Sequence, residues 1–239
     1  MRKLCLVLSI AAMAALVACS SESGTEVSSE LPPGFSKPSP ESSNEKAPSS
    51  SSVKPDVSVV MGTLTDERDG QTYRTVKIGD QEWMAENLNY KLEDSFCYEE
   101  EEANCAKYGQ LYIWKTATEA CPAGWHLPSK GEFETLIEFV GGEDVAGTKL
   151  ATTSGWKDFN YSSLNGTDDY SFSALPGGYW RIEADGSDAE FLNGGYNASF
   201  WSSTEHGSDV AYGIFLTGDP LLIIDWDGDC GLSVRCLKD

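Results

Sequence analysis

The chain has 239 residues, with 38 acidic and 17 basic side chains and a formal net charge of −21. Nucleic-acid binding needs clustered lysine and arginine that release counterions, so this balance argues against a nucleic-acid partner. It equally disfavours docking on anionic lipid headgroups through basic patches. The composition therefore favours an extracytoplasmic protein and names no activity.

The start of the chain resembles a bacterial lipoprotein signal peptide. Two basic residues precede an apolar stretch of about fourteen residues, which is shorter than the roughly twenty that span a bilayer. The stretch ends in Leu16-Val17-Ala18-Cys19, which is similar to a lipobox. The resemblance implies that residues 1–18 are removed and that acylated Cys19 anchors the protein to a membrane. Ser20, in place of an inner-membrane retention Asp, points to the outer membrane, with an ordinary secretory signal as the alternative.

Residues 19–60 are predicted to be a disordered tether. Within residues 20–56 there are 13 Ser, 6 Pro and 5 Glu, and Phe35 is the one aromatic side chain. Such a segment cannot bury enough apolar surface to offset its ordering entropy, and its mean reach would be about 30–35 Å. All seven tryptophans lie in residues 61–239, which we expect to form one domain.

The pattern after residue 61 predicts a three-stranded meander with tight turns. Alternating strand-like runs are separated by Gly-containing dipeptides that are typical of hairpin turns. The predicted strands are Leu64–Glu67, Tyr73–Ile78 and Glu82–Leu88, joined at Asp69-Gly70 and Gly79-Asp80.

Two helices are expected next. Residues Leu111–Ala120 place apolar side chains on one helical face and are followed by Cys121-Pro122. The second helix opens with a capping box, Ser129 to Glu132, and closes at Gly141-Gly142.

Short strands are expected in the second half of the chain. The candidates are Ser199–Ser203, Val210–Leu216, Leu221–Trp226 and Leu232–Leu237. The glutamate run Glu99–Glu102 is predicted to be a solvated loop. Two helices in the first half with strands at both ends predict an α+β domain.

Several multi-residue motifs occur in a distinctive order along residues 62–239. They are Asp69-Gly70-Gln71-Thr72-Tyr73, Gln81-Glu82-Trp83-Met84-Ala85-Glu86-Asn87-Leu88-Asn89-Tyr90, Cys121-Pro122-Ala123-Gly124-Trp125-His126-Leu127-Pro128-Ser129, Gly166-Thr167-Asp168-Asp169-Tyr170, Phe172-Ser173-Ala174-Leu175-Pro176-Gly177-Gly178, Trp201-Ser202-Ser203-Thr204-Glu205 and Ser233-Val234-Arg235-Cys236. Together they resemble the Fibrobacter succinogenes major paralogous domain, a family of exported bacterial proteins whose function is largely unassigned. That family is similar to the C-type-lectin-like fold, shared with sulfatase-modifying domains. The resemblance implies two helices, short antiparallel strands, close termini and a long irregular loop region that carries binding.

Five cysteines remain for the folded part. Cys97 and Cys105 flank a seven-residue loop and are expected to pair. Cys121 and Cys236 match the long-range bridge that the resemblance implies. Cys230 is left over, either as a buried free thiol or as an intermolecular or ligand-reactive thiol.

Aromatic side chains in the irregular half suggest ligand contacts. Trp180 and Trp226 lie among Gly, Asn and Asp, a setting that suits stacking on sugar rings, although either ring could instead belong to the core. Trp201 is expected in the core. Asp168 and Asp169 follow Asn-Gly and are candidates for ligand or metal contacts, with turn chemistry as the alternative.

Asp225, Asp227 and Asp229 alternate around a tryptophan and a glycine. Three carboxylates at this spacing could wrap Ca²⁺, the one cofactor that the sequence suggests. No companion Glu stands at the EF-hand position, and the order departs from the Trp-Asn-Asp triplet of Ca²⁺-dependent lectins. A solvated acidic turn is therefore the competing interpretation.

No catalytic motif is present, and the two histidines, His126 and His206, form no Ser-His-Asp or HExxH pattern. We therefore expect a non-catalytic, surface-exposed outer-membrane module that recognises a glycan such as a plant or cell-wall polysaccharide. The alternatives are a protein-interaction, display or structural envelope protein. A remote one is a metal-dependent oxidase related to sulfatase-modifying enzymes, for which Cys230 and Cys236 would be the cysteine pair, although their neighbouring residues do not match.

Overall fold

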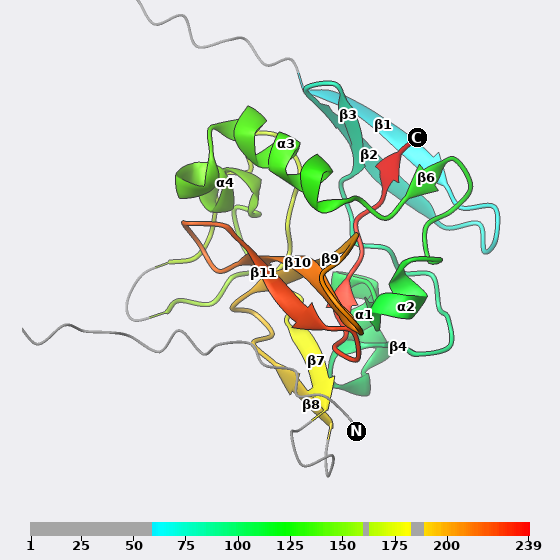
Figure 1. The fold of residues 1–239 in the computed structure, drawn as a ribbon. Coiled ribbons are helices and arrows are strands. Elements are labelled where there is room, and N and C mark those ends of the chain that lie inside the picture. The colour runs from blue at the N-terminus through cyan, green and yellow to red at the C-terminus, as the bar shows by residue number, and fades with distance from the viewer. Residues whose placement is uncertain (1–58, 160–162, 183–188) are drawn as a thin grey trace, which may run out of the picture. The chain divides into compact units, whose positions relative to one another are not determined.

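A computed structural model describes residues 59–159, 163–182 and 189–239. These residues form an α+β fold with a five-stranded sheet, a six-stranded sheet and a separate two-stranded hairpin. In Figure 1, helices α3 (Lys130–Val140) and α4 (Glu143–Leu150) lie at one end, and the hairpin of β7 (Tyr179–Ile182) and β8 (Ala189–Leu192) lies at the other. The predicted signal peptide, Cys19 and nearly all of the predicted tether lie outside the described residues.

The first sheet has the order β1-β2-β3-β13-β6 and contains the predicted meander, but its first strand covers Val60–Thr65 and not the predicted Leu64–Glu67. Its strands are β1 (Val60–Thr65), β2 (Thr72–Ile78), β3 (Gln81–Met84), β6 (Trp125–His126) and β13 (Leu237–Lys238). Gly70 and Gly79 have φ angles of 78° and 61°, which glycine adopts without a Cβ clash, so both predicted turns form. The third strand ends at Met84 instead of Leu88, because Asn87 turns inward to bond the side chain of Arg235.

The second sheet has the order β11-β10-β9-β12-β5-β4. Its strands are β4 (Ser95–Phe96), β5 (Leu111–Tyr112), β9 (Ala198–Glu205), β10 (Val210–Leu216), β11 (Leu222–Asp227) and β12 (Leu232–Ser233). The predicted strand Val210–Leu216 has the bounds of β10. The strands predicted on either side of it also form, with ends that differ by one to two residues.

The predicted strand Leu232–Leu237 is wrong as a single element. The segment forms β12, which pairs with β5 and β9, and then β13, which pairs with β3 and β6 of the other sheet. All its residues from Leu232 to Leu237 are buried. A strand with one solvated face would alternate between buried and exposed, so this burial reflects a chain that passes through the core from one sheet to the other.

The helices were predicted in part. Helix α3 has the expected capping box between Ser129 and Glu132, and it ends at Gly141, whose φ of 116° is left-handed. The helix predicted over Leu111–Ala120 shrinks to α2 (Trp114–Ala117), because Leu111 and Tyr112 pair as β5.

Two further helices, α1 (Glu102–Tyr108) and α4, were not predicted. Helix α1 lies next to a one-turn 3-10 helix, η1 (Tyr98–Glu100), so the glutamate run is partly helical although its side chains are exposed, as expected. Cys105 is the one buried residue of α1, and a helix with a single buried residue shows no periodic pattern of apolar residues in the sequence.

The apolar core consists of two clusters. In one, Trp83 lies 5.1 Å from Phe133 and 5.8 Å from Phe172, measured between ring centroids, beneath α3 and α4. It contains a cavity of about 10 Å³, lined only by apolar side chains such as Leu136 and Ile214. That volume is near the minimum for one water, so the cavity is a packing defect and not a binding pocket.

Arg235 is fully buried where the two sheets meet. Its Nε donates to Asn87 Oδ1 at 2.6 Å, and its Nη2 donates to the carbonyl of Ser173 at 2.8 Å. Its Nη1 donates to the carbonyls of Met84 at 3.2 Å and Phe172. Burial lowers the pKa of Arg235 to about 9, still well above neutrality, so the guanidinium is charged in the folded domain. This one side chain therefore joins the end of the meander, the irregular segment and the C-terminal segment.

Candidate ligand-binding face

Four aromatic side chains gather where the β7–β8 hairpin meets β4 and the segment that follows it. Trp180 and Phe191 are cross-strand partners in the hairpin, so they lie on the same face of it. Phe96 stacks on Trp180 with centroids 4.5 Å apart, and Tyr98 contacts Phe191 edge-on at 5.4 Å. All four are half-buried, and we call Phe96, Tyr98, Trp180 and Phe191 the aromatic face.

Two glycines seat Tyr98 in this face. A Cβ built on Gly178 or Gly194 would lie 2.8 Å or 2.4 Å from the Tyr98 ring, closer than real Cβ atoms approach. The backbone N–H of Gly194 donates to the Tyr98 hydroxyl at 3.1 Å. Burial, opposed in part by this bond and assisted by the charge of Glu99, raises the pKa of Tyr98, which keeps the phenol neutral. The ring is therefore held in a fixed orientation.

The segment that carries Tyr98 is closed by a disulfide. Cys97 pairs with Cys105, with the two Cα atoms 4.8 Å apart. Glu99 and Glu100 between them have left-handed φ angles of 56° and 59°, which are uncommon for residues other than glycine. The side chain of Asn104 donates to the carbonyl of Tyr98 at 2.9 Å. These constraints fix a short loop whose side chains would otherwise sample many positions.

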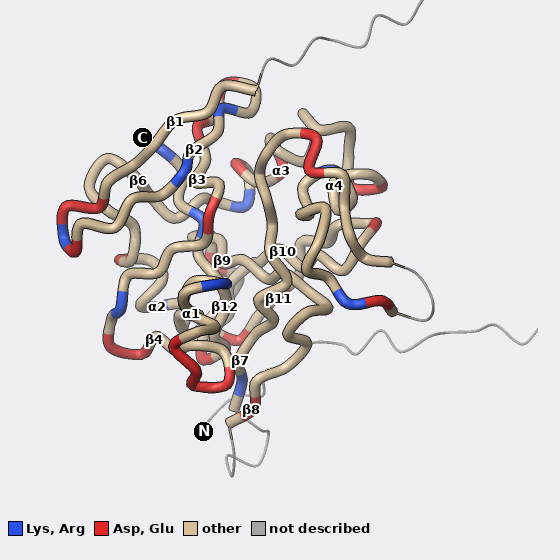
Figure 2. The backbone as a smooth tube through the Cα atoms, turned by 180° about the vertical axis from the view of Figure 1, so that it is seen from behind, with Lys and Arg blue, Asp and Glu red and all other residues tan. Residues whose placement is uncertain are grey.

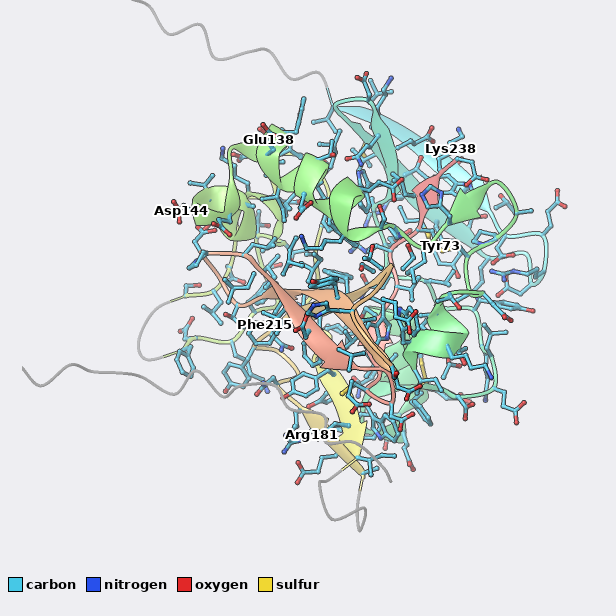
Figure 3. The ribbon with its side chains drawn as sticks, in the orientation of Figure 1. Tyr73, Glu138, Asp144, Arg181, Phe215 and Lys238 are labelled. Atoms are coloured by element: carbon cyan, nitrogen blue, oxygen red, sulfur yellow. A yellow bond between two sulfur atoms is a disulfide. The ribbon has the colours of Figure 1, made fainter. Side chains whose placement is uncertain are left out.

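The hairpin itself is tied to the core. Trp180 exchanges two backbone hydrogen bonds with Gly231, at 2.9 and 2.8 Å. On the opposite face, Tyr179 lies 5.1 Å from the buried ring of Trp226. Arg181, labelled on β7 in Figure 3, pairs with Glu190 of β8 at 3.3 Å. The hairpin thus has one core-facing side and one aromatic side.

The two tryptophans that were predicted to contact a ligand differ in their exposure to solvent. Trp180 belongs to the aromatic face, but Trp226 is 1 % exposed and packs in the second core cluster, so its ring is not accessible to a ligand. Trp201 is fully buried, as expected, and its indole N–H donates to the carbonyl of Tyr112 at 2.6 Å.

The three alternating aspartates do not converge. Asp225 accepts a hydrogen bond from Nδ1 of His206 at 2.8 Å, and buried Asp227 accepts the backbone N–H of Asp229 at 3.1 Å. No group of three His, Cys, Asp or Glu residues that could hold a metal occurs within the described residues. Asp225 and Asp227 lie in β11 and only Asp229 lies in the turn after it, so the three carboxylates form neither one acidic turn nor a converging ligand set for calcium.

Asp168 and Asp169 also have different surroundings. Asp168 accepts both the backbone N–H and the hydroxyl of Ser173, each at 2.7 Å, and its burial raises the pKa of its carboxyl group. Asp169 is exposed. Because the carbonyl of Ser173 binds Arg235, Asp168 supports the core junction.

The two histidines are both bonded to carboxylates. The ring of His126 bridges Asp239 at 2.8 Å and Glu132 at 3.0 Å. His206, besides its bond to Asp225, stacks on Tyr212 with centroids 4.5 Å apart. These contacts orient the rings within the fold.

The disulfide predictions are confirmed for Cys97–Cys105 and for Cys121–Cys236. Cys230 is fully buried, but it is disulfide-bonded, so the expectation of a free thiol there is wrong. Cys19, the predicted lipid attachment site, lies outside the described residues.

Three of the four residues of the aromatic face were missed from the sequence. Phe96 and Tyr98 lie more than 80 residues before the hairpin and meet it only in the folded chain. The short Cys97–Cys105 loop and the glycine pair Gly194-Gly195 were the available signals, since both indicate a locally constrained backbone.

None of the helices within residues 59–159, 163–182 and 189–239 is long and apolar enough to cross a membrane.

Comparison with known proteins gives one match. No curated protein and no solved structure was found to match the chain. The model of the Fibrobacter succinogenes major domain matches residues 76–238, which contain the six-stranded sheet, the five-stranded sheet without β1 and the start of β2, the Arg235 junction and the aromatic face. The chain therefore belongs to the Fibrobacter succinogenes major domain family.

Proposed function

We propose that this protein is a non-catalytic, cell-surface binding module that recognises a glycan through its aromatic face. The observation that carries the proposal is the stacked, half-exposed pair of Phe96 and Trp180 beside Tyr98 and Phe191. Flat aromatic rings suit the C–H faces of sugars, and rings that are already fixed lose little entropy on binding.

The finer part of the fold, a C-type-lectin-like arrangement, is included in this proposal. Its supports are the Cys121–Cys236 bridge, which spans 115 residues, and the first and last strands, β1 and β13, which share one sheet. In Figure 1 the start of β1 and the C-terminus lie at the same end of the domain. The aromatic face also lies partly in the irregular second half, where the resemblance places binding.

The cellular location is likewise a proposal. The lipobox-like sequence ending in Cys19 supports a lipid anchor in the outer membrane, and the Ser- and Pro-rich segment after it supports a flexible stalk. A glycan on the outside of the cell would then be within reach of the domain.

A protein partner is the second candidate, and one observation favours it. Strand β11 is the edge of the six-stranded sheet, and its residues Leu222, Ile223 and Ile224 are half-exposed. Open strand edges can accept a further strand from another chain.

The test is affinity electrophoresis of the full-length protein in detergent against soluble cellulose derivatives, hemicelluloses and solubilised peptidoglycan, each with and without EDTA. We expect retardation by at least one polysaccharide, and Trp180→Ala should weaken it on the order of tenfold. Trp125→Ala, which changes a half-buried tryptophan on β6, is the matched control and should keep binding. Absence of retardation by all of them would overturn the glycan proposal and favour the protein partner. Loss of retardation in EDTA would show that a metal takes part.

A further inference from the structure

Carboxylates surround one side of the aromatic face. The segment from Glu93 to Tyr108 carries six carboxylates and one lysine, a net charge of −5. Four of those carboxylates, Glu99 to Glu102, are exposed and follow Tyr98 directly. Figure 2 shows these acidic positions gathered between β4 and α1, beside β7. We call Glu99, Glu100, Glu101 and Glu102 the acidic rim.

The four charges of the acidic rim outnumber the cation nearest to Tyr98, Lys157, whose ammonium donates to the carbonyl of Gly194 at 3.1 Å. Within the described residues, no ion pair involves these four glutamates. On the facing hairpin, the charge of Arg181 is matched by Glu190. The charge of Glu99 also acts on the aromatic face, since with burial it contributes to the raised pKa of Tyr98.

We infer that the aromatic face takes polysaccharides without carboxylate groups and rejects uronate-bearing ones, because the acidic rim repels a polyanion at the contact surface. The inference rests on the proposed glycan-binding function and names its ligand class. The carboxylates act as a selectivity element, and the binding contacts remain those of the aromatic rings. Neutral chains meet no repulsion there and expose the C–H faces that the rings contact.

The size of the effect follows from Coulomb's law. Two like charges about 10 Å apart in water repel enough to weaken binding about twofold. Four rim carboxylates acting on one nearby uronate would therefore weaken binding on the order of tenfold at low salt. Because the screening length falls from about 30 Å at 0.01 M to about 3 Å at 1 M salt, the discrimination should disappear at high ionic strength.

The test uses two matched pairs of polymers with the full-length protein in nonionic detergent. Hydroxyethylcellulose is compared with carboxymethylcellulose, and neutral arabinoxylan with glucuronoxylan, at ~0.02 M and ~0.5 M salt. We expect the neutral member of the bound pair to be preferred on the order of tenfold at low salt and the two to approach parity at high salt.

Two charge variants complete the experiment. The quadruple variant Glu99→Gln, Glu100→Gln, Glu101→Gln, Glu102→Gln should lose most of the discrimination and keep neutral binding. The control variant Glu134→Gln, Glu138→Gln, Glu143→Gln, Asp144→Asn changes the net charge equally, on exposed positions of α3 and α4. It should keep the discrimination, since Glu138 and Asp144 lie far from Arg181 in Figure 3.

The outcomes separate the two proposals. Equal binding of the neutral and acidic polymers at low salt, or equal effects of the two quadruple variants, would overturn the charge selection while leaving glycan binding intact. If neither member of any pair binds the wild-type protein, the charge selection fails, and the proposed function fails with it when solubilised peptidoglycan is not bound either.

Discussion

Replacing Arg235 should remove a large part of the stability of the domain. The side chain is fully buried and donates four hydrogen bonds to neutral acceptors, one amide oxygen and three backbone carbonyls. In Arg235→Met these four acceptors lose their donor. An unsatisfied buried acceptor costs about 1–3 kcal/mol, which places the gross loss at roughly 4–12 kcal/mol.

Part of that loss is offset, because methionine does not carry a buried charge. Desolvation of an ion in a protein costs several kcal/mol, and measured losses on breaking buried charged networks are about 3–5 kcal/mol. We therefore expect Arg235→Met to lower the free energy of unfolding by about 4 kcal/mol. A small domain has about 5–15 kcal/mol in total, so this one change approaches the limit for folding.

The measurement is urea unfolding followed by tryptophan fluorescence, at neutral pH and with the disulfides intact. Arg74→Met is the control, because Arg74 makes an exposed ion pair with Glu86 at 3.2 Å and should cost less than about 1 kcal/mol. Arg235→Lys should fall between the two, since an ammonium cannot reproduce the planar fork. A loss below about 1 kcal/mol for Arg235→Met would refute the role of Arg235 as the junction of the two sheets.

Three further predictions concern local stability. Ser129→Ala removes the capping box of α3 and should lower the free energy of unfolding by about 1 kcal/mol in the same urea assay, and an unchanged midpoint would contradict the capping role. Replacing Cys121 and Cys236 with Ala opens a loop of about 115 residues, which lowers the free energy of unfolding by up to about 4.8 kcal/mol on the chain-entropy model. Calorimetry should therefore show a larger fall in Tm than removal of the Cys97–Cys105 bridge causes. Partial burial opposes the charge of His126, but its hydrogen bonds to Asp239 and Glu132 outweigh burial and raise its pKa. The contribution of His126 to the free energy of unfolding is thus fully present below about pH 6.5 and is lost as pH rises through the folded pKa. Tm should therefore fall between pH 6 and 9, and Asp239→Asn should make this fall smaller.

The elements that sequence reasoning predicted best are those with a local cause. The capping box at Ser129 and the turns at Gly70 and Gly79 depend on a few adjacent residues, and each forms as expected. The prediction of a single strand over Leu232–Leu237 was wrong for the opposite reason. The alternation of this segment fits one strand, but burial on both sides and pairing with two different sheets depend on distant parts of the chain.

The residues of the candidate site were also hard to predict where their positions depend on distant parts of the chain. Polar and glycine-rich neighbours suggested ligand contacts for both Trp180 and Trp226 and left a core position open for each, and only Trp180 is half-exposed. Whether a tryptophan is exposed depends on what packs over it, and Phe96 reaches Trp180 across 84 positions of sequence. Neither composition nor periodicity contains that contact.

The motifs that reveal the family and the residues that we propose for binding are different residues, and this separation has a physical reason. Asn87, Phe172, Ser173 and Arg235 come from three motifs and meet at one buried junction, where the requirement for mutual hydrogen bonding restricts each residue. The aromatic face lies outside the motifs and touches them through Gly178, whose missing Cβ makes room for Tyr98. These motifs therefore identify the domain through residues of its core. Two proteins that share the motifs share the fold, but the motifs do not determine which ligand each protein binds. The ligand must be inferred from β4, the segment after it and the β7–β8 hairpin, where aromatic rings and unpaired carboxylates can change without disturbing the junction.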